Sequence, residues 1–147
     1  MTHAYSKLYL ESSQDVLGHA FDWIANTCNK SLSEFCDNFA KSRISHMFEI
    51  GYPRYVTGCN GAELVNFVRE DLELPEYEFP HEFYADKSPE YWAGWTLAYF
   101  QWKTKLTFAE ILQKIPVEKI LSLYPTGHEQ DIRSVADILQ EWFETAL

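Results

Sequence analysis

The sequence predicts an all-α fold, a single compact domain of about seven helices packed around a central Trp/Tyr-rich helix at about 89–104. Two observations support this prediction. Apolar side chains recur at helical spacing along most of the 147 residues, and no stretch shows the alternation typical of a half-buried strand. In addition, residues 88–102 would be apolar on almost every side of a helix. A helix that is apolar all round is typical of the middle of a fold.

The first helix is expected to run from about Leu8 to Cys28. Its apolar residues fall on one broad face, as in an amphipathic helix at the protein surface. The opposite face should be solvated, and it carries Glu11, Asp15, His19, Asp22 and Asn26.

Local capping signals predict most of the other helix starts. Four tetrapeptides begin with a capping residue and end with glutamate, at 31–34, 60–63, 107–110 and 126–129. Ser88 followed by Pro89 suits the N-cap and first turn of the central helix. Within this helix Gly94 and Ala98 leave a strip of small residues, where another helix could approach closely.

Residues 73–88 interrupt the helices. Two prolines lie inside this segment and another follows it, so the segment cannot form a continuous helix. Its aromatic content predicts an ordered loop strapped across the helices. We expect this loop to bind a protein partner through its acidic and aromatic side chains, which are Glu73, Glu76, Tyr77, Glu78, Phe79, Glu82, Phe83, Tyr84 and Asp86.

The net charge of −10 is concentrated around this loop. Residues 70–90 hold eight acidic side chains and one lysine, and therefore seven of the ten net negative charges. This balance argues against binding of bare nucleic acid, because phosphate contacts need clustered lysine and arginine. A basic protein surface is the expected partner.

Candidate metal sites are weak. His46 and Glu49 could share a helical face, but no further carboxylates accompany them, and we expect both to be solvated surface residues. Glu78 and His81 have a spacing known from di-iron bundles, but Pro80 breaks the helix that this spacing requires. We therefore expect no metal and no cofactor.

Nucleophilic catalysis is also not indicated. Cys28 and Cys36 fall on apolar helix faces, whereas Cys59 lies in a turn and should be the accessible one. There is no nucleophile elbow and no phosphate-binding glycine loop. The chain is expected not to be an enzyme. Three cysteines without CxxC spacing, no signal-like start and no run of about 20 apolar residues favour a cytoplasmic protein with reduced thiols.

Three segments resemble a family of small all-helical bacterial proteins of about this length. They are 9–22, 51–64 and 91–102, and residues 123–129 also fit. Members of that family are often encoded beside proteins similar to ADP-ribosyltransferase toxins, so the resemblance implies an antitoxin-like partner role. It implies no catalytic residues, and the acidic stretch from Glu73 to Asp86 departs from the family pattern.

Three functions remain open from the sequence. The leading hypothesis is a protein-interaction module, an antitoxin-like inhibitor whose acidic loop covers a basic cleft of a toxin or effector. The second is an acidic DNA mimic that inhibits a nucleic-acid-handling protein. The third is a helix-turn-helix regulator, because two short helices with a tight turn follow the central one and Lys114 and Lys119 lie in this region. The aromatic stripe of the central helix could be core or could line a pocket.

Overall fold

The computed structural model describes residues 2–146, and every regular element in this range is helical. The ten α-helices are α1 (Leu10–Asp22), α2 (Leu32–Lys41), α3 (Arg43–Glu49), α4 (Pro53–Val56), α5 (Gly61–Asp71), α6 (Pro89–Thr104), α7 (Phe108–Lys114), α8 (Val117–Leu121), α9 (Tyr124–Gly127) and α10 (Ile132–Thr145). The predicted all-α class and the central helix at 89–104 are confirmed.

The prediction of about seven helices is wrong. Two of the ten are single turns, α4 and α9, and a four-residue turn is too short to show helical periodicity. The expected helix over 8–28 is also divided into a 3₁₀ turn at Lys7–Tyr9, α1, and a π-helical stretch at Trp23–Thr27. In that stretch Cys28 N–H donates to the carbonyl of Trp23, five residues earlier.

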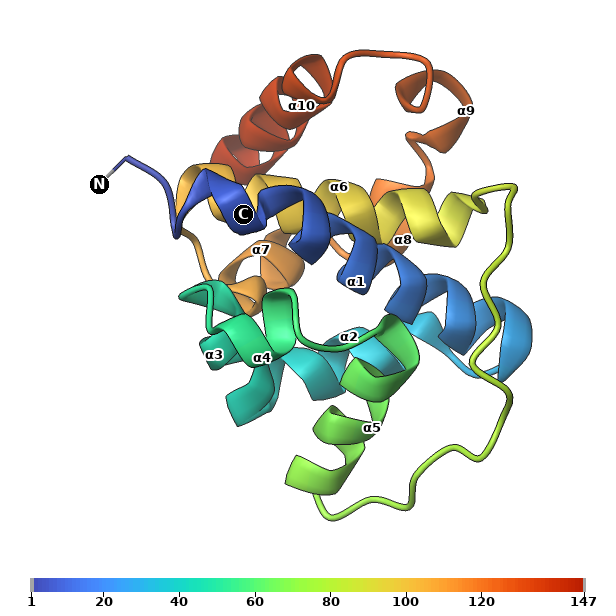
Figure 1. The fold of residues 1–147 in the computed structure, drawn as a ribbon. Helices are drawn as coiled ribbons and strands as arrows, with labels where there is room; N and C mark the ends of the chain where they lie inside the picture. Colours follow the sequence, from blue (N-terminus) through green and yellow to red (C-terminus); the bar gives the residue numbers. More distant parts are fainter. Residues whose placement is uncertain (1, 147) are drawn as a thin grey trace.

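Helices α1 and α6 form the centre of the molecule and lie side by side in Figure 1. Gly94 lets the two backbones come close, because a Cβ at this position would lie 2.4 Å from the carbonyl oxygen of Leu17. Gly94 of the predicted strip of small residues therefore lies at the contact with α1. A second close contact joins the two helices at Gly18 of α1. A Cβ on Gly18 would lie 3.0 Å from the ring of Tyr91 in α6.

The other helices cover this pair on two sides. Helices α9 and α10 lie on one side of α6, and α2 to α5 lie on the other side of α1 (Figure 1). Helix α5 begins directly on the α1 backbone, since a Cβ on Gly61 would come within 2.1 Å of the nitrogen of Ala20. Between α2, α3 and α7 the rings of Phe39, Phe48 and Phe108 pack at centroid distances of 4.9–6.0 Å.

The capping predictions hold for three of the four tetrapeptides. The side chain at residues 31, 60 and 107 accepts from the backbone N–H three residues later. Ser88 and Pro89 begin α6 as expected. The cap predicted at Thr126 is wrong, because residues 124–127 form α9 and Asp131 caps α10 by accepting from Arg133 N–H.

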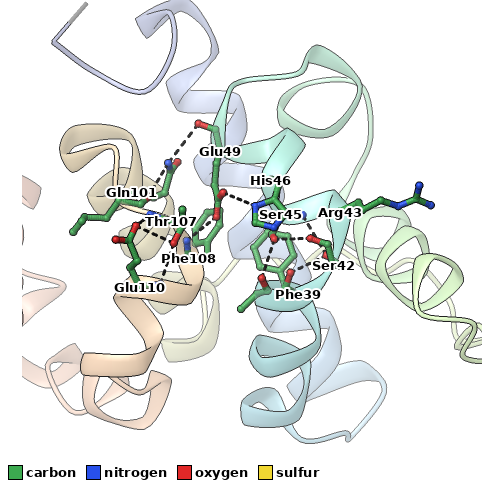
Figure 2. A network of polar contacts seen from close by, with 12 residues as sticks. Phe39, Ser42, Arg43, Ser45, His46, Glu49, Gln101, Thr107, Phe108 and Glu110 are labelled. Atoms are coloured by element: carbon green, nitrogen blue, oxygen red, sulfur yellow. Dashed lines mark hydrogen bonds and ion pairs between the residues drawn. The ribbon is translucent and has the colours of Figure 1, made fainter.

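The prediction for Glu49 is also wrong. Its side chain is 8% exposed and joins α3 to α7, whereas a solvated surface position was expected for it. One carboxylate oxygen accepts from Phe108 N–H at 2.7 Å, and the other lies 3.2 Å from Nδ1 of the exposed His46 (Figure 2). The backbone carbonyl of Glu49 also accepts from Gln101 Nε2, so this residue connects α3, α6 and α7. Burial raises the pKa of Glu49.

No helix within residues 2–146 is long and apolar enough to cross a membrane.

Candidate functional site

Residues 73–88, called the strap below, connect α5 to α6 along the outside of the helices (Figure 1). Inside the strap no residue belongs to a helix, so its backbone groups must find partners elsewhere. Side chains of the helices provide several of them.

The first half of the strap is held by α5. The amide of Asn66 makes two hydrogen bonds to the backbone of Tyr77, accepting from its N–H at 2.9 Å and donating to its carbonyl at 3.2 Å. Arg69 donates to the Pro75 carbonyl and to the Tyr77 hydroxyl, and its guanidinium lies 3.9 Å from the centre of the Tyr77 ring. Tyr77 therefore faces the helices and anchors the strap.

The middle of the strap is held by the end of α1 and the π-helical stretch. Trp23 donates from Nε1 to the Pro80 carbonyl at 2.7 Å, and its ring meets His81 edge-on. His19 lies 2.8 Å from the Glu82 carbonyl through Nε2, and its ring stacks on Phe83 with centroids 4.0 Å apart.

The tautomer of His19 follows from its two contacts. Its Nδ1 accepts from Gly61 N–H at 2.8 Å, so the proton is on Nε2 and is donated to Glu82. The ring is neutral in this arrangement, and burial lowers its pKa. His19 thus connects α1, the start of α5 and the strap.

Asp22 holds the end of the strap. Its Oδ1 accepts from the hydroxyl of Ser88 at 2.6 Å and from the amide of Asn26 at 2.8 Å. Ser88 in turn caps α6 by accepting from Tyr91 N–H. The position of the strap and the start of the central helix are therefore coupled through one carboxylate.

The polar face expected for the first helix is only partly solvated, because Glu11, Asp15 and Asn26 are exposed but His19 and Asp22 are not. His19 and Asp22 are each only 5% exposed, because the strap and the first turn of α6 cover them. Periodicity identified the polar face correctly but could not show what covers it, since the covering residues lie more than 60 positions further along the chain.

The acidic side chains of the strap are exposed, unlike Tyr77. Glu73, Glu76, Glu78, Glu82 and Asp86 are all exposed, and none forms an ion pair with a residue in the range 2–146. Glu82 accepts a hydrogen bond from its neighbour Tyr84 at 2.7 Å. Glu73 has a left-handed backbone, with φ of 58°, at the turn that follows α5.

Three aromatic side chains of the strap are also exposed. Phe79 is 39% exposed, Tyr84 42% and Phe83 65%, although all three are large and partly apolar. Of the nine residues predicted to bind a partner, Tyr77 is the one that serves mainly as an internal anchor. The other eight are all exposed, and together they are called the strap surface below.

Two cavities adjoin the end of the strap. One of about 410 Å³ lies between the strap and the polar face of α1, and another of about 440 Å³ lies between α6, α9 and α10. Asp15, Lys87 and Tyr91 line both. The second cavity is also lined by Trp92 and Trp95, so part of the aromatic stripe lines a pocket.

Several residues of the site were not predicted as such, among them His19, Asp22, Trp23, Asn66, Arg69 and Tyr91. For Asp22 and His19 the sequence offers one usable signal, a polar pair on a helix that carries an unusually wide apolar face. Asn66 and Arg69 have no signal, because they look like ordinary polar positions of an amphipathic helix.

No group of three or more His, Cys, Asp or Glu is arranged to hold a metal ion within residues 2–146. The thiols lack an activating environment. Cys36 is fully buried, and burial raises the pKa of Cys28 to about 11 and that of the half-buried Cys59 to about 12.

Comparison with known proteins gives no relatives. No family model matches the chain, and no curated protein and no solved structure is significantly similar to it.

Proposed function

We propose that this protein is a non-enzymatic interaction module, an antitoxin-like inhibitor that binds a basic surface of a protein partner through the strap surface. The observation that supports it best is the contrast within the strap. Its backbone is bound to α5 through Asn66, to the π-helical stretch through Trp23 and to α1 through His19, whereas its carboxylates and three of its rings are exposed.

Such a surface is suited to binding for two physical reasons. A loop whose backbone is already held in place loses little conformational entropy when a partner binds. Exposed carboxylates without internal ion pairs attract a basic partner over a long range and raise the association rate, while exposed rings supply buried area in the complex.

A toxin or effector is the proposed class of partner because of the family resemblance described above. Inhibition would be steric, since the strap would cover a basic cleft. The DNA-mimic alternative uses the same charges, and it differs in that duplex DNA competes for the partner.

The helix-turn-helix alternative is less favoured by the contacts of its basic residues. The ammonium groups of Lys114 and Lys119 lie 4.6 Å and 4.4 Å from the rings of Phe143 and Trp142 in α10. Both lysines are therefore engaged with the protein itself, and α8 has only five residues to offer to a DNA groove.

The test is affinity capture from the source cell with three baits. These are the wild type, a strap variant with Glu73, Glu76, Glu78 and Glu82 changed to Gln, and a control in which four acidic residues elsewhere, Glu11, Glu34, Glu129 and Glu141, are changed to Gln. The proposal expects one stoichiometric protein with the wild type and the control, lost with the strap variant and lost at high salt.

Equal capture by all three baits would contradict the proposal, and so would recovery of nucleic acid alone. Release of the captured protein by duplex DNA would favour the DNA-mimic alternative.

A further inference from the structure

The cavity of about 410 Å³ at the end of the strap has an unusual lining. Three carboxylates contribute to it, those of Asp15, Asp22 and Asp86, and so do the rings of Phe83, Tyr84 and Tyr91. Acidic and aromatic groups therefore meet in one concave site, on the same side of the molecule as the strap surface.

Asp22 is the unusual member of this lining. The residue is only 5% exposed, yet its hydrogen bonds from Ser88 and Asn26 both go to Oδ1. Within residues 2–146 no donor reaches Oδ2. A carboxylate has about four acceptor positions, and Oδ2 is not among the side-chain oxygens that are buried without a partner, so solvent or a further donor can reach it. This oxygen is therefore available to a donor that enters the cavity from outside the described chain.

The cations of the protein itself do not meet this need. Lys87 lies at the cavity, but its ammonium group is 4.5 Å from the centre of the Tyr91 ring and forms no ion pair within the described part of the chain. His19 is neutral, because Gly61 and Glu82 occupy its two nitrogens. The three carboxylates are thus opposed by one lysine.

We propose that this cavity binds an arginine side chain of the protein partner. A guanidinium is planar, carries five donors and can bridge carboxylates while it stacks on an aromatic face. The three carboxylates supply acceptors, and the three rings supply faces for stacking and cation–π contact. One cation already lies over such a face, since the ammonium group of Lys87 is 4.5 Å from the centre of the Tyr91 ring.

The proposal rests on the proposed function for the source of the arginine, and it adds the side chain that the partner contributes. The exposed Asp86 would close the site from the strap side.

The test is a titration of the isolated protein with N-acetyl-arginine methylamide, followed by NMR. The neutral isostere N-acetyl-citrulline methylamide and the corresponding lysine compound serve as ligand controls. A dissociation constant in the millimolar range is expected for one side chain. Shifts are expected at Asp22, Phe83, Asp86 and Tyr91, with binding of citrulline at least tenfold weaker.

Asp86→Asn and Asp22→Asn should each weaken arginine binding about fivefold or more, whereas Asp37→Asn, at an exposed position in α2, should leave it unchanged. Because Asp22 also holds Ser88, the spectrum of free Asp22→Asn first has to show the native fold, and Asp86→Asn decides the question if it does not. Equal binding of arginine and citrulline, or shifts that these variants do not reduce, would overturn the proposal.

The test of the arginine site and the test of the proposed function can fail independently. Arginine binding that fails while the strap-dependent capture of a partner persists refutes the arginine site alone. Arginine binding that persists while no partner depends on the strap surface refutes the proposed function alone.

Discussion

Nδ1 of His19 accepts a hydrogen bond of 2.8 Å from the backbone N–H of Gly61, and the other nitrogen of the same ring donates to the strap. One neutral side chain thus hydrogen-bonds both the backbone N–H of Gly61 at the start of α5 and the carbonyl of Glu82. A protonated ring could not accept from Gly61, so this junction depends on the protonation state of His19.

We predict that His19 makes stability depend on pH. Burial lowers the pKa of His19 in the folded protein, so the unfolded chain takes up the proton first as the pH falls below about 6.5. The stability that neutral His19 contributes to the fold is complete above about pH 6.5 and is lost progressively as the pH falls below that value. His19→Gln offers a donor and an acceptor without titrating, and comparing urea unfolding of the two proteins from pH 5 to 7.5 isolates the effect. A difference in unfolding free energy that does not change with pH would contradict it.

We predict that the hydrogen bonds of Asn66 keep the strap ordered. Asn66→Ala leaves the N–H and carbonyl of Tyr77 without their partners, and hydrogen exchange at Tyr77 and its neighbours should become at least tenfold faster. Asn66→Asp retains the acceptor and loses only the donor, so its effect should be smaller. Exchange in α10, remote from the strap, provides the internal reference. Unchanged exchange at Tyr77 in Asn66→Ala would show that other contacts hold the strap.

We predict that Gly94 cannot carry a side chain. In Gly94→Ala the new methyl group would lie 2.4 Å from the carbonyl oxygen of Leu17, which is backbone and cannot rotate away. Separating α1 from α6 should cost roughly 2 kcal/mol or more, within the 1–3 kcal/mol typical of overpacking or above it. Thermal unfolding measures the loss, with Ser134→Ala on the exposed face of α10 as the control. An unfolding temperature equal to that of the wild type would contradict the close approach.

We predict opposite effects for two substitutions of Glu49. Because burial raises the pKa of this carboxyl, its charged form is disfavoured in the folded protein, and the free energy of unfolding falls as the pH rises above about 4.3. Glu49→Gln keeps an acceptor for Phe108 N–H and removes the charge, so it should match or exceed wild-type stability at pH 7. Glu49→Leu leaves that N–H unpaired and should cost about 1–3 kcal/mol. Equal losses in both variants, measured by urea unfolding at pH 4 and 7, would argue against this explanation.

The features that the sequence predicted well are local. The caps at Asn60 and Thr107 each depend on a glutamate three residues away, and Ser88 depends on the following proline, so no distant contact is needed to recognise them. The central position of α6 also followed from its own composition. The single turns α4 and α9 were missed because four residues contain no period.

The features that the sequence did not reveal depend on distant contacts. The burial of His19 and Asp22 depends on strap and α6 residues more than 60 positions away, and the burial of Glu49 depends on the start of α7. The candidate partner residues were chosen for charge and aromatic character. Only the structure separates Tyr77, which binds Asn66 and Arg69, from the exposed remainder.

The most direct test of the proposed interaction is hydrogen exchange of this chain, free and bound to the protein that it captures. The strap surface as the binding site predicts slower exchange in the complex at residues 76–86 and at the first turn of α6, with α7 and α8 unchanged. Slower exchange confined to α7, α8 or α10, with the strap as accessible as in the free protein, would contradict it.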